Sequence, residues 1–435
     1  MKRKANQDPF DYFRRLGENV ERKWREKNYD AAVFPKIAAN ELAEQSPAGH
    51  INALDVIRSV GANHALPSQQ DVSGHFSNLP ITLFSGTRFY VDIYFWLDGT
   101  TTIHQHGFAG AFQVLSGSSL HSHYGFVPKQ IVSPHFAIGT MTLEKTQLLS
   151  QGDIKQIIPG SSYIHSLFHL DRPSATITVR TYGLPSAQPQ FSYLKPGIAF
   201  DPFLTDPSIT KKVQSVNLLF AMRHPDADSI IKKMLLQSDL HSAFMILDAA
   251  YQHLSGDAVE QHLGLSHSAR RFDKLLGSVR ARHGKIVDIF SDAFAEGRRQ
   301  GKLIQRRGNV TSEELRFFLA LLLNIAGRKR ILRLVRNRFP DHPPTETVLS
   351  WIEELSQIRV LGSHESSVIG IEEFGDKHLL VIECLLEGKS LEQSQSDLRK
   401  IFRHESAREL DKQTEDICDS LKRASIIAPL FAHEI

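Results

Sequence analysis

The sequence predicts an α+β protein in which an antiparallel β-barrel is preceded by helices and followed by a large all-α region. Three observations support this fold class. Residues 9 to about 27 carry apolar side chains at helical spacing. From Ile81 to Gly183, short apolar or alternating runs are separated by Gly, Pro, Ser and Asp, which is typical of a barrel or sandwich. After about residue 210 the pattern is helical to the end of the chain.

The N-terminal region begins with a clear helix signal. Asp8 can cap a helix whose first residue is Pro9. A second short helix is predicted around residues 35 to 45. Between His50 and Ser77 the sequence is mixed and polar, and it predicts no defined element.

The barrel region contains one strand with a clean alternation. From Arg88 to Leu97, apolar side chains alternate with a set of larger, more polar ones, which predicts two different faces. Further strands are predicted at residues 108–116, 119–127, 136–149, 154–158 and 174–182. A new strand carrying His165 is predicted after the Pro159-Gly160 turn.

The second half of the chain is predicted to be helical. Residues 184 to 210 carry five prolines, which predict a linker or strap without regular structure. Capping boxes are predicted at Thr311 to Glu314 and at Ser390 to Gln393. The predicted division is an N-terminal helical extension (1–78), a barrel with a metal site (79–185), a Pro-rich linker (186–210), a basic helical region (211–340) and an acidic helical region (341–435).

Composition and charge limit the classes of function that the sequence allows. At 435 residues and a net charge of +3, the chain has room for two or three domains and no overall preference for an acidic partner. Its two cysteines have no CxxC spacing, its N-terminus has no apolar signal region, and its longest apolar run is too short to span a bilayer. These features predict a soluble cytoplasmic protein.

The helical half is unevenly charged. Residues 268–340 hold 18 Lys+Arg and 6 Asp+Glu, whereas residues 341–435 hold 10 and 19. A basic block can bind nucleic acid. The neighbouring acidic block favours a different interpretation, in which the two blocks pack together and neutralise one another.

The functional prediction starts from His104 and His106, which stand one residue apart ahead of an apolar run. In a strand, residues i and i+2 point to the same face, so both imidazoles can reach one metal ion. His165 lies on a strand that can return beside this pair. Three neutral imidazoles on one side of an ion leave the other side open, as in a catalytic site.

Residues 80 to 185 resemble the cupins, a family of antiparallel barrels of the jelly-roll type. The first cupin motif is matched by His104, His106 and Gly117, with Gly110 where the family has a glutamate. The second motif is approximated by the following residues: Gly152, Pro159, Gly160, His165 and His169. The resemblance implies a cupin-type barrel with His104, His106 and His165 as metal ligands.

Replacement of the glutamate by Gly110 makes the site similar to that of the thiol dioxygenases. That resemblance implies Fe(II) held by three histidines, with O2 and a small chelating substrate on the open face. The positions of a Ser, His, Tyr trio in cysteine dioxygenases correspond here to Thr178, Arg180 and Tyr182. It implies Tyr182 as an acid near the metal, Arg180 as a permanent cation, and Thr178 and His169 beside the ligands.

Two departures leave the substrate unnamed. The strand from Leu79 to Phe84 has no arginine to hold a cysteine carboxylate, and Gly110 excludes the cysteine crosslink of some relatives. Arg180 can instead bind an anion or pair with Asp92. A second HxH, His121 and His123, follows the Gly117 turn and is predicted to be solvent-exposed.

The sequence therefore predicts a mononuclear non-haem Fe(II) oxygenase that uses O2 and a small molecule. Zn, Mn and Ni also accept imidazole ligands, so a Zn- or Mn-dependent cupin isomerase or hydrolase is one alternative. A non-catalytic cupin sensor with a nucleic-acid- or protein-binding helical region is another. The helical half is also the predicted site of homo-oligomer or protein contacts, with no membrane association.

Overall fold

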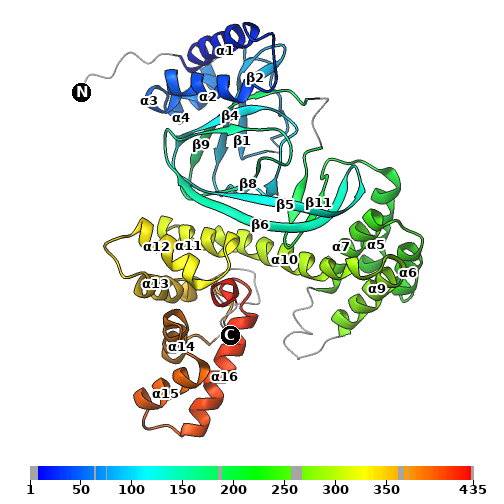
Figure 1. The fold of residues 1–435 in the computed structure, drawn as a ribbon, viewed down its shortest axis with the longest axis vertical. Helices are drawn as coiled ribbons and strands as arrows, with labels where there is room; N and C mark the ends of the chain where they lie inside the picture. The colour runs from blue at the N-terminus through cyan, green and yellow to red at the C-terminus, as the bar shows by residue number, and fades with distance from the viewer. Residues whose placement is uncertain are drawn as a thin grey trace. The chain divides into compact units, whose positions relative to one another are not determined.

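A computed structural model describes residues 8–62, 65–74, 76–184, 189–255, 267–360, 367–371 and 373–432. The chain divides into two compact units, Met1–Gly297 and Arg298–Ile435. The first contains all the β-strands that form the two sheets. The predicted α+β class is confirmed, with N-terminal helices, a closed antiparallel barrel and a large helical region (Figure 1).

Four helices precede the barrel: α1 Pro9–Arg25, α2 Phe34–Gln45, α3 Pro47–His50 and α4 Ala53–Ala62. The first two match their predicted ranges closely, and the Asp8 side chain accepts a hydrogen bond from the Phe10 amide. The last two fall where the sequence predicted no element. The apolar face of α1, which includes Phe13, Leu16 and Val20, is fully buried in a core shared with the adjacent sheet.

The first sheet has the strand order β1-β2-β9-β4-β7, all antiparallel. Its strands are β1 Leu79–Ser85, β2 Phe89–Trp96, β4 Gly110–Ser116, β7 Ile154–Ile157 and β9 Ser174–Thr181. Both faces of β2 are buried, because the side chains of Phe89, Val91, Ile93 and Phe95 pack under the N-terminal helices. The alternate side chains, from Tyr90 to Trp96, are also buried and point to the other face of the strand. The second sheet lies beyond the first in Figure 1.

The second sheet closes on itself in the order β10-β11-β6-β5-β8-β3. Its strands are β3 Ile103–His104, β5 Ser119–Ser133, β6 Phe136–Leu149, β8 Ile164–His169, β10 Ser192–Leu194 and β11 Ile198–Phe200. β5 and β6 form a long hairpin that runs beyond the predicted end of the first strand at residue 127.

The prediction that residues 184–210 lack regular structure is wrong for β10 and β11. β10 pairs with β3, opposite His104, and β11 pairs with β6. Both strands are only three residues long. Pro189, Pro196 and Pro202 lie before, between and after them, where no ladder amide is needed.

The remaining chain is helical: α5 Pro207–Ala221, α6 Ala227–Leu236, α7 Leu240–Leu254, α9 His267–His283, η1 Lys285–Asp288, α10 Ile289–Arg307, α11 Glu313–Asn324, α12 Arg328–Arg338, α13 Pro344–Gln357, α14 Asp376–Glu387, α15 Leu391–Ile401, α16 Ala407–Arg423 and η2 Ala428–Phe431. The capping box at Ser390 and Gln393 is confirmed. The other predicted box is replaced by a cap one residue later, where Ser312 accepts from the Leu315 amide. None of the described helices has the length and apolar character that a membrane crossing needs.

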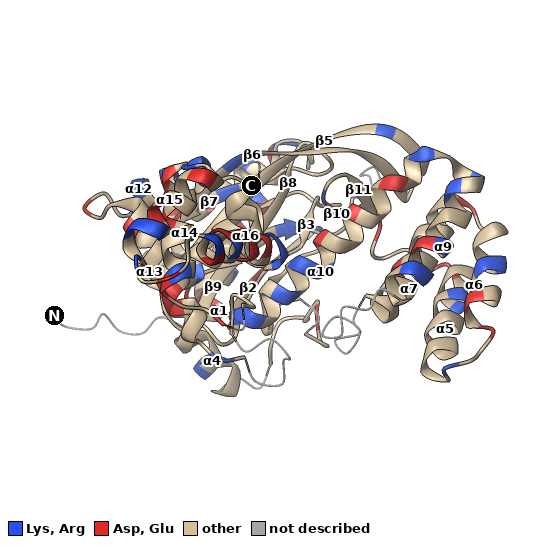
Figure 2. Cartoon of the chain, turned by 90° about the horizontal axis from the view of Figure 1, so that it is seen from below, with Lys and Arg blue, Asp and Glu red and all other residues tan. Residues whose placement is uncertain are grey.

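Lys and Arg recur along α10 and α12 (Figure 2), but several of these cations are used inside the second unit. The Arg306 guanidinium donates to the carbonyl of Val368 at 2.7 Å, and that of Arg328 donates to the carbonyl of Leu385 at 2.6 Å. Arg307 is fully buried. Part of the basic excess between residues 268 and 340 therefore satisfies backbone carbonyls and is not available at the surface.

Candidate metal centre

Three predicted ligands come together inside the barrel. The imidazole nitrogens that His104, His106 and His165 offer all lie within 4.8 Å of one another, and all three residues are buried. His104 on β3 is directly opposite His165 on β8, so the two side chains point to the same face. His106 follows two residues later, where the Gly160 amide donates to its carbonyl at 2.8 Å.

A hydrogen bond to a backbone carbonyl shows which nitrogen of the His104 ring is free to face the centre. His104 Nδ1 lies 2.8 Å from the Thr102 carbonyl oxygen, an acceptor, so this nitrogen carries the hydrogen and Nε2 keeps its lone pair. His106 Nε2 and His165 Nε2 are 2.8 Å apart. His106 Nδ1 is buried without a hydrogen-bond partner in the described part of the chain.

All three rings are held in the neutral form that binds metals. Burial lowers the pKa of His104, and it lowers the pKa values of His106 and His165 well below the usual range of histidine. The positive charge of Arg180 lowers the pKa of His104 and of His106 further. Three neutral imidazoles and no carboxylate fit a divalent first-row ion with open coordination positions.

His121 corrects the prediction of an exposed HxH pair. Its side chain is fully buried, and its Nε2 lies 2.8 Å from Nδ1 of His165. The prediction failed because β5 is long and pairs with β8 from Ser119 onward, so His121 lies within the sheet and not in a turn. His123 is half-buried directly opposite His165, with its ring centroid 4.2 Å from that of His121.

Tyr163 was missed by sequence reasoning. Its ring centroid lies 4.7 Å from that of His165, and its hydroxyl is 3.5 Å from His121 Nε2. Burial raises the pKa of this phenol well above its usual range, so it stays protonated. The signal was its place two residues before His165, on the same face of one extended segment.

Gly110 has a steric reason to be glycine. A Cβ added there would collide with the carbonyl oxygen of Val179 and come within 3.0 Å of the Arg180 Cα, and both are backbone atoms. β4 and β9 are in register at this point, with Gly110 opposite Arg180. The carboxylate of the cupin motif is therefore absent from a position where the backbone leaves no room for any side chain.

The predicted residues on and after β9 lie in different surroundings. The Arg180 guanidinium carbon is 3.3 Å from the ring centroid of Phe108 and 5.3 Å from that of Tyr90. Thr178 is buried between Asp92 and Phe112 in the strand register. The Tyr182 hydroxyl donates to the Gly86 carbonyl at 3.0 Å, on the β1–β2 connection. A role for Tyr182 as an acid stays a prediction, and this hydrogen bond competes with it.

His169 does not occupy the predicted place beside His165. It is four residues further along β8, and it stacks on Trp96 with ring centroids 4.6 Å apart. Its Nδ1 lies 2.9 Å from the Ser174 hydroxyl. Four strand residues correspond to roughly 13 Å, which is too far for a hydrogen bond. The partner of His165 is His121 instead.

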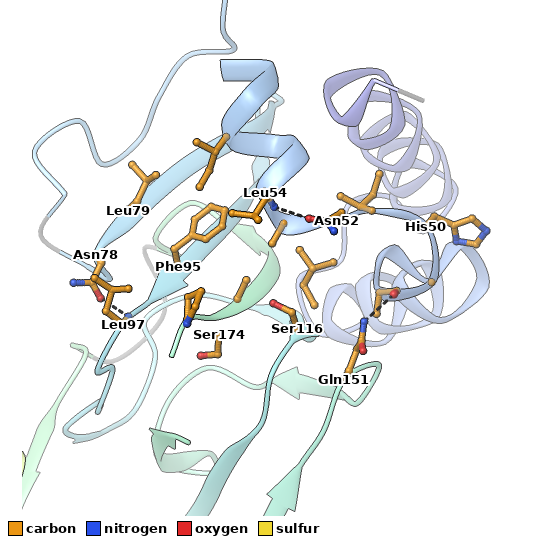
Figure 3. Close-up of a pocket in the computed structure, with 18 residues that line it drawn as sticks. His50, Asn52, Leu54, Asn78, Leu79, Phe95, Leu97, Ser116, Gln151 and Ser174 are labelled. Carbon is orange, nitrogen blue, oxygen red and sulfur yellow. Dashed lines mark hydrogen bonds between the residues drawn. The ribbon is translucent and has the colours of Figure 1, made fainter. Parts of the chain in front are cut away.

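A separate cavity of about 710 Å³ lies between the segment of α3 and α4 and one end of the first sheet (Figure 3). Leu54, Leu79, Phe95 and Leu97 line it, and no charged residue does. Phe95 and Ala175 belong to the sheet face that packs under the N-terminal helices. The sheet therefore separates this cavity from the histidine cluster.

No family model and no curated protein sequence matches the chain. Similar solved structures include hydroquinone 1,2-dioxygenase from Sphingomonas sp. TTNP3 with 4-hydroxybenzoate bound, at 10% identity over 26% of this chain and 70% of that one, with a TM-score of 0.19. DMSP lyase DddQ from Ruegeria pomeroyi DSS-3 is 14% identical over 32% of this chain and 74% of that one, with a TM-score of 0.21. Recombinant oxalate oxidase in complex with glycolate is 17% identical over 29% of this chain and 56% of that one, with a TM-score of 0.17. Similarity at this level assigns neither a family nor an activity.

Proposed function

We propose that this protein is a mononuclear non-haem Fe(II) oxygenase that oxidises a small chelating molecule with O2. The observation that carries the proposal is the convergence of three buried, neutral histidines in a barrel interior, at a centre where Gly110 leaves no carboxylate. His104, His106 and His165 would hold the ion. Bound there, Fe(II) would supply the chemistry of O2 activation.

The surrounding residues orient and shield this centre. His121 Nε2 lies 2.8 Å from His165 Nδ1, and a His165 that binds the ion through Nε2 would carry its hydrogen on Nδ1 and donate it to His121. Phe108, Phe112 and Tyr163 are buried in one apolar cluster, and all three rings lie near the metal histidines. They keep bulk water from the site. Arg180 adds a fixed positive charge beside Phe108.

The test is metal content and O2 consumption. Wild-type protein purified under anaerobic conditions should hold close to one iron per chain, and His104→Ala should lose most of it. His224→Ala is the control, because His224 lies between α5 and α6, outside the barrel. Full iron occupancy in His104→Ala would sink the assignment of the site.

A zinc- or manganese-dependent isomerase or hydrolase is the second candidate, since three neutral imidazoles also suit these ions. Oxygen consumption by the iron-loaded and the zinc-loaded protein distinguishes the two candidates. Iron-loaded protein that consumes O2 with a small chelating substrate supports the oxygenase. Full activity of the zinc-loaded protein without O2 consumption would replace it with the second candidate.

A further inference from the structure

The exposed face of α12 carries a line of cations. Residues 327–340 hold six Lys+Arg and no Asp or Glu. Lys329, Arg333 and Arg336 follow one another at spacings of four and three residues, which places them on one face of the helix. All three are exposed, and Arg330 is exposed at the edge of the same face. Lys329, Arg333 and Arg336 form the basic stripe of α12.

The opposite face of α12 fixes the helix in the second unit. Ile331 and Val335 are fully buried there. The Arg328 guanidinium donates to a backbone carbonyl of α14 at 2.6 Å, and Arg338 pairs with Glu313. The cations of α12 that hold the fold together are therefore not those of the basic stripe.

No described carboxylate neutralises the basic stripe. Within the described ranges, none of its three side chains forms an ion pair. Carboxylates of the acidic region pair with cations of that same region, such as Asp397 with Lys389 at 2.9 Å and Asp411 with Arg399 at 2.6 Å. The interpretation in which the acidic block neutralises the basic block therefore does not apply to this stripe.

The basic stripe is electrostatically unfavourable for the helix that carries it. Lys329 lies in the first turn, where the helix dipole disfavours a positive charge, and that turn holds no acid. Arg333 has a like charge four residues before it and another three residues after it, and such neighbours repel one another. Because no ion pair in the described chain offsets this repulsion, the stripe is suited to a partner with several negative charges.

The spacing and chemistry of the stripe fit a nucleic-acid backbone. From Lys329 to Arg336 the helix rises by about 10 Å. Over that length a DNA duplex presents about six phosphate charges. Two of the three cations are arginines, whose planar guanidinium groups bind phosphate oxygens in a fork.

The same face favours duplex DNA over other polyanions. None of the large apolar residues that are exposed in the described chain lies on α12, so the helix has no apolar surface to insert into a membrane. It also has no aromatic side chain on which the bases of a single strand could stack. The wide major groove of DNA admits an α-helix, whereas the deep, narrow major groove of duplex RNA does not.

We propose that the basic stripe of α12 binds the phosphates of duplex DNA. The stripe lies in the second unit and the histidine cluster in the first, so this inference does not depend on the proposed function. Since all three side chains of the stripe are cations, the binding depends on salt more than on base sequence.

The test is fluorescence anisotropy of a labelled DNA duplex of about 20 base pairs, or two helical turns, titrated with the full chain. Three phosphate contacts predict a slope of about −2.7 for log affinity against log salt, which is a fall of about 40-fold between about 50 and about 200 mM salt. The triple variant Lys329→Gln, Arg333→Gln, Arg336→Gln should bind at least about tenfold more weakly at low salt and lose most of this slope. Its urea midpoint should not fall, because the substitutions remove repulsion from an exposed face.

Two further variants separate charge at this position from charge in general. A second triple variant, Lys232→Gln, Lys233→Gln, Lys274→Gln, removes the same charge from exposed positions of α6 and α9 and should leave affinity and slope unchanged. Arg333→Lys with Arg336→Lys should keep the slope, since both charges remain. Equal losses in the two triple variants would overturn the proposal. Tighter binding to a single strand of the same length, to an RNA duplex or to anionic phospholipid vesicles would also overturn it.

Discussion

His121 Nε2 lies 2.8 Å from His165 Nδ1, so one buried histidine orients another that is predicted to bind metal. The first ring is itself held near the Gln147 amide, at 3.5 Å from its Nδ1. If His165 binds a metal through Nε2, its hydrogen lies on Nδ1, where His121 Nε2 is placed to accept it.

We predict that His121→Ala weakens metal binding by roughly 10- to 100-fold, because residues that orient a ligand typically contribute that much. The measurement is competition with a chelator of known affinity. His121→Gln should lose less, since an amide oxygen can accept from His165 Nδ1. Affinity in His121→Ala equal to that of wild type would contradict the role.

We predict that Gly110→Ala destabilises the barrel by about 1 to 3 kcal/mol, because the added methyl group meets backbone atoms of β9 that cannot move aside. Urea unfolding gives the value. Gly277→Ala is the control, since a Cβ in that exposed helical position meets nothing within 4 Å. Similar unfolding free energies for Gly110→Ala and wild type would mean that β4 and β9 separate easily here.

We predict that the metal-free protein loses stability as the pH falls below about 6.5. The pKa values of His104, His106, His121 and His165 are lowered in the folded state, mainly by burial. On acidification the unfolded chain binds protons that the folded chain does not. Each such histidine therefore lowers the free energy of unfolding by up to about 1.4 kcal/mol per pH unit.

The test is urea unfolding of chelator-treated protein at pH values from about 5.5 to about 8. This range spans the ordinary histidine pKa of about 6.5. His104→Gln should flatten the pH dependence, because the glutamine side chain does not titrate. A stability that rises on acidification would show that these imidazoles become charged in the folded protein.

We predict that Arg328→Met destabilises the second unit by about 1 to 3 kcal/mol, because the carbonyls of Leu385 and Leu386 lose their buried donor. Metal content should not change. Arg330→Met, on an exposed arginine of the same helix, is the control. Equal protease resistance of the two variants would argue against a structural role for Arg328.

Local patterns predicted much of the fold. The period-2 alternation around Val91 and the Asp8-Pro9 helix start need only a few neighbouring residues, and both are confirmed. The pair His104 and His106 was visible for the same reason. The pairing of either with His165 depends on a register between distant strands, which the sequence suggested only through the position of His165 after a turn.

The predictions that failed concern features that depend on pairing between distant strands. His121 looked exposed because its burial depends on how far β5 extends and on its pairing with β8. β10 and β11 looked irregular because they are short and lie among prolines, so propensity argued against them. In both cases long-range pairing overrode the local signal.

The short strand β10 has a practical consequence for dividing this chain into fragments. β3, which carries His104, has only two residues, and its outer neighbour is β10, whose Tyr193 hydroxyl also donates to the Gln105 side chain at 2.6 Å. A fragment that stops at residue 185 would leave β3 as an open edge. The smallest recombinant piece able to bind metal should therefore extend at least through Phe200, where the last strand of the closed sheet ends.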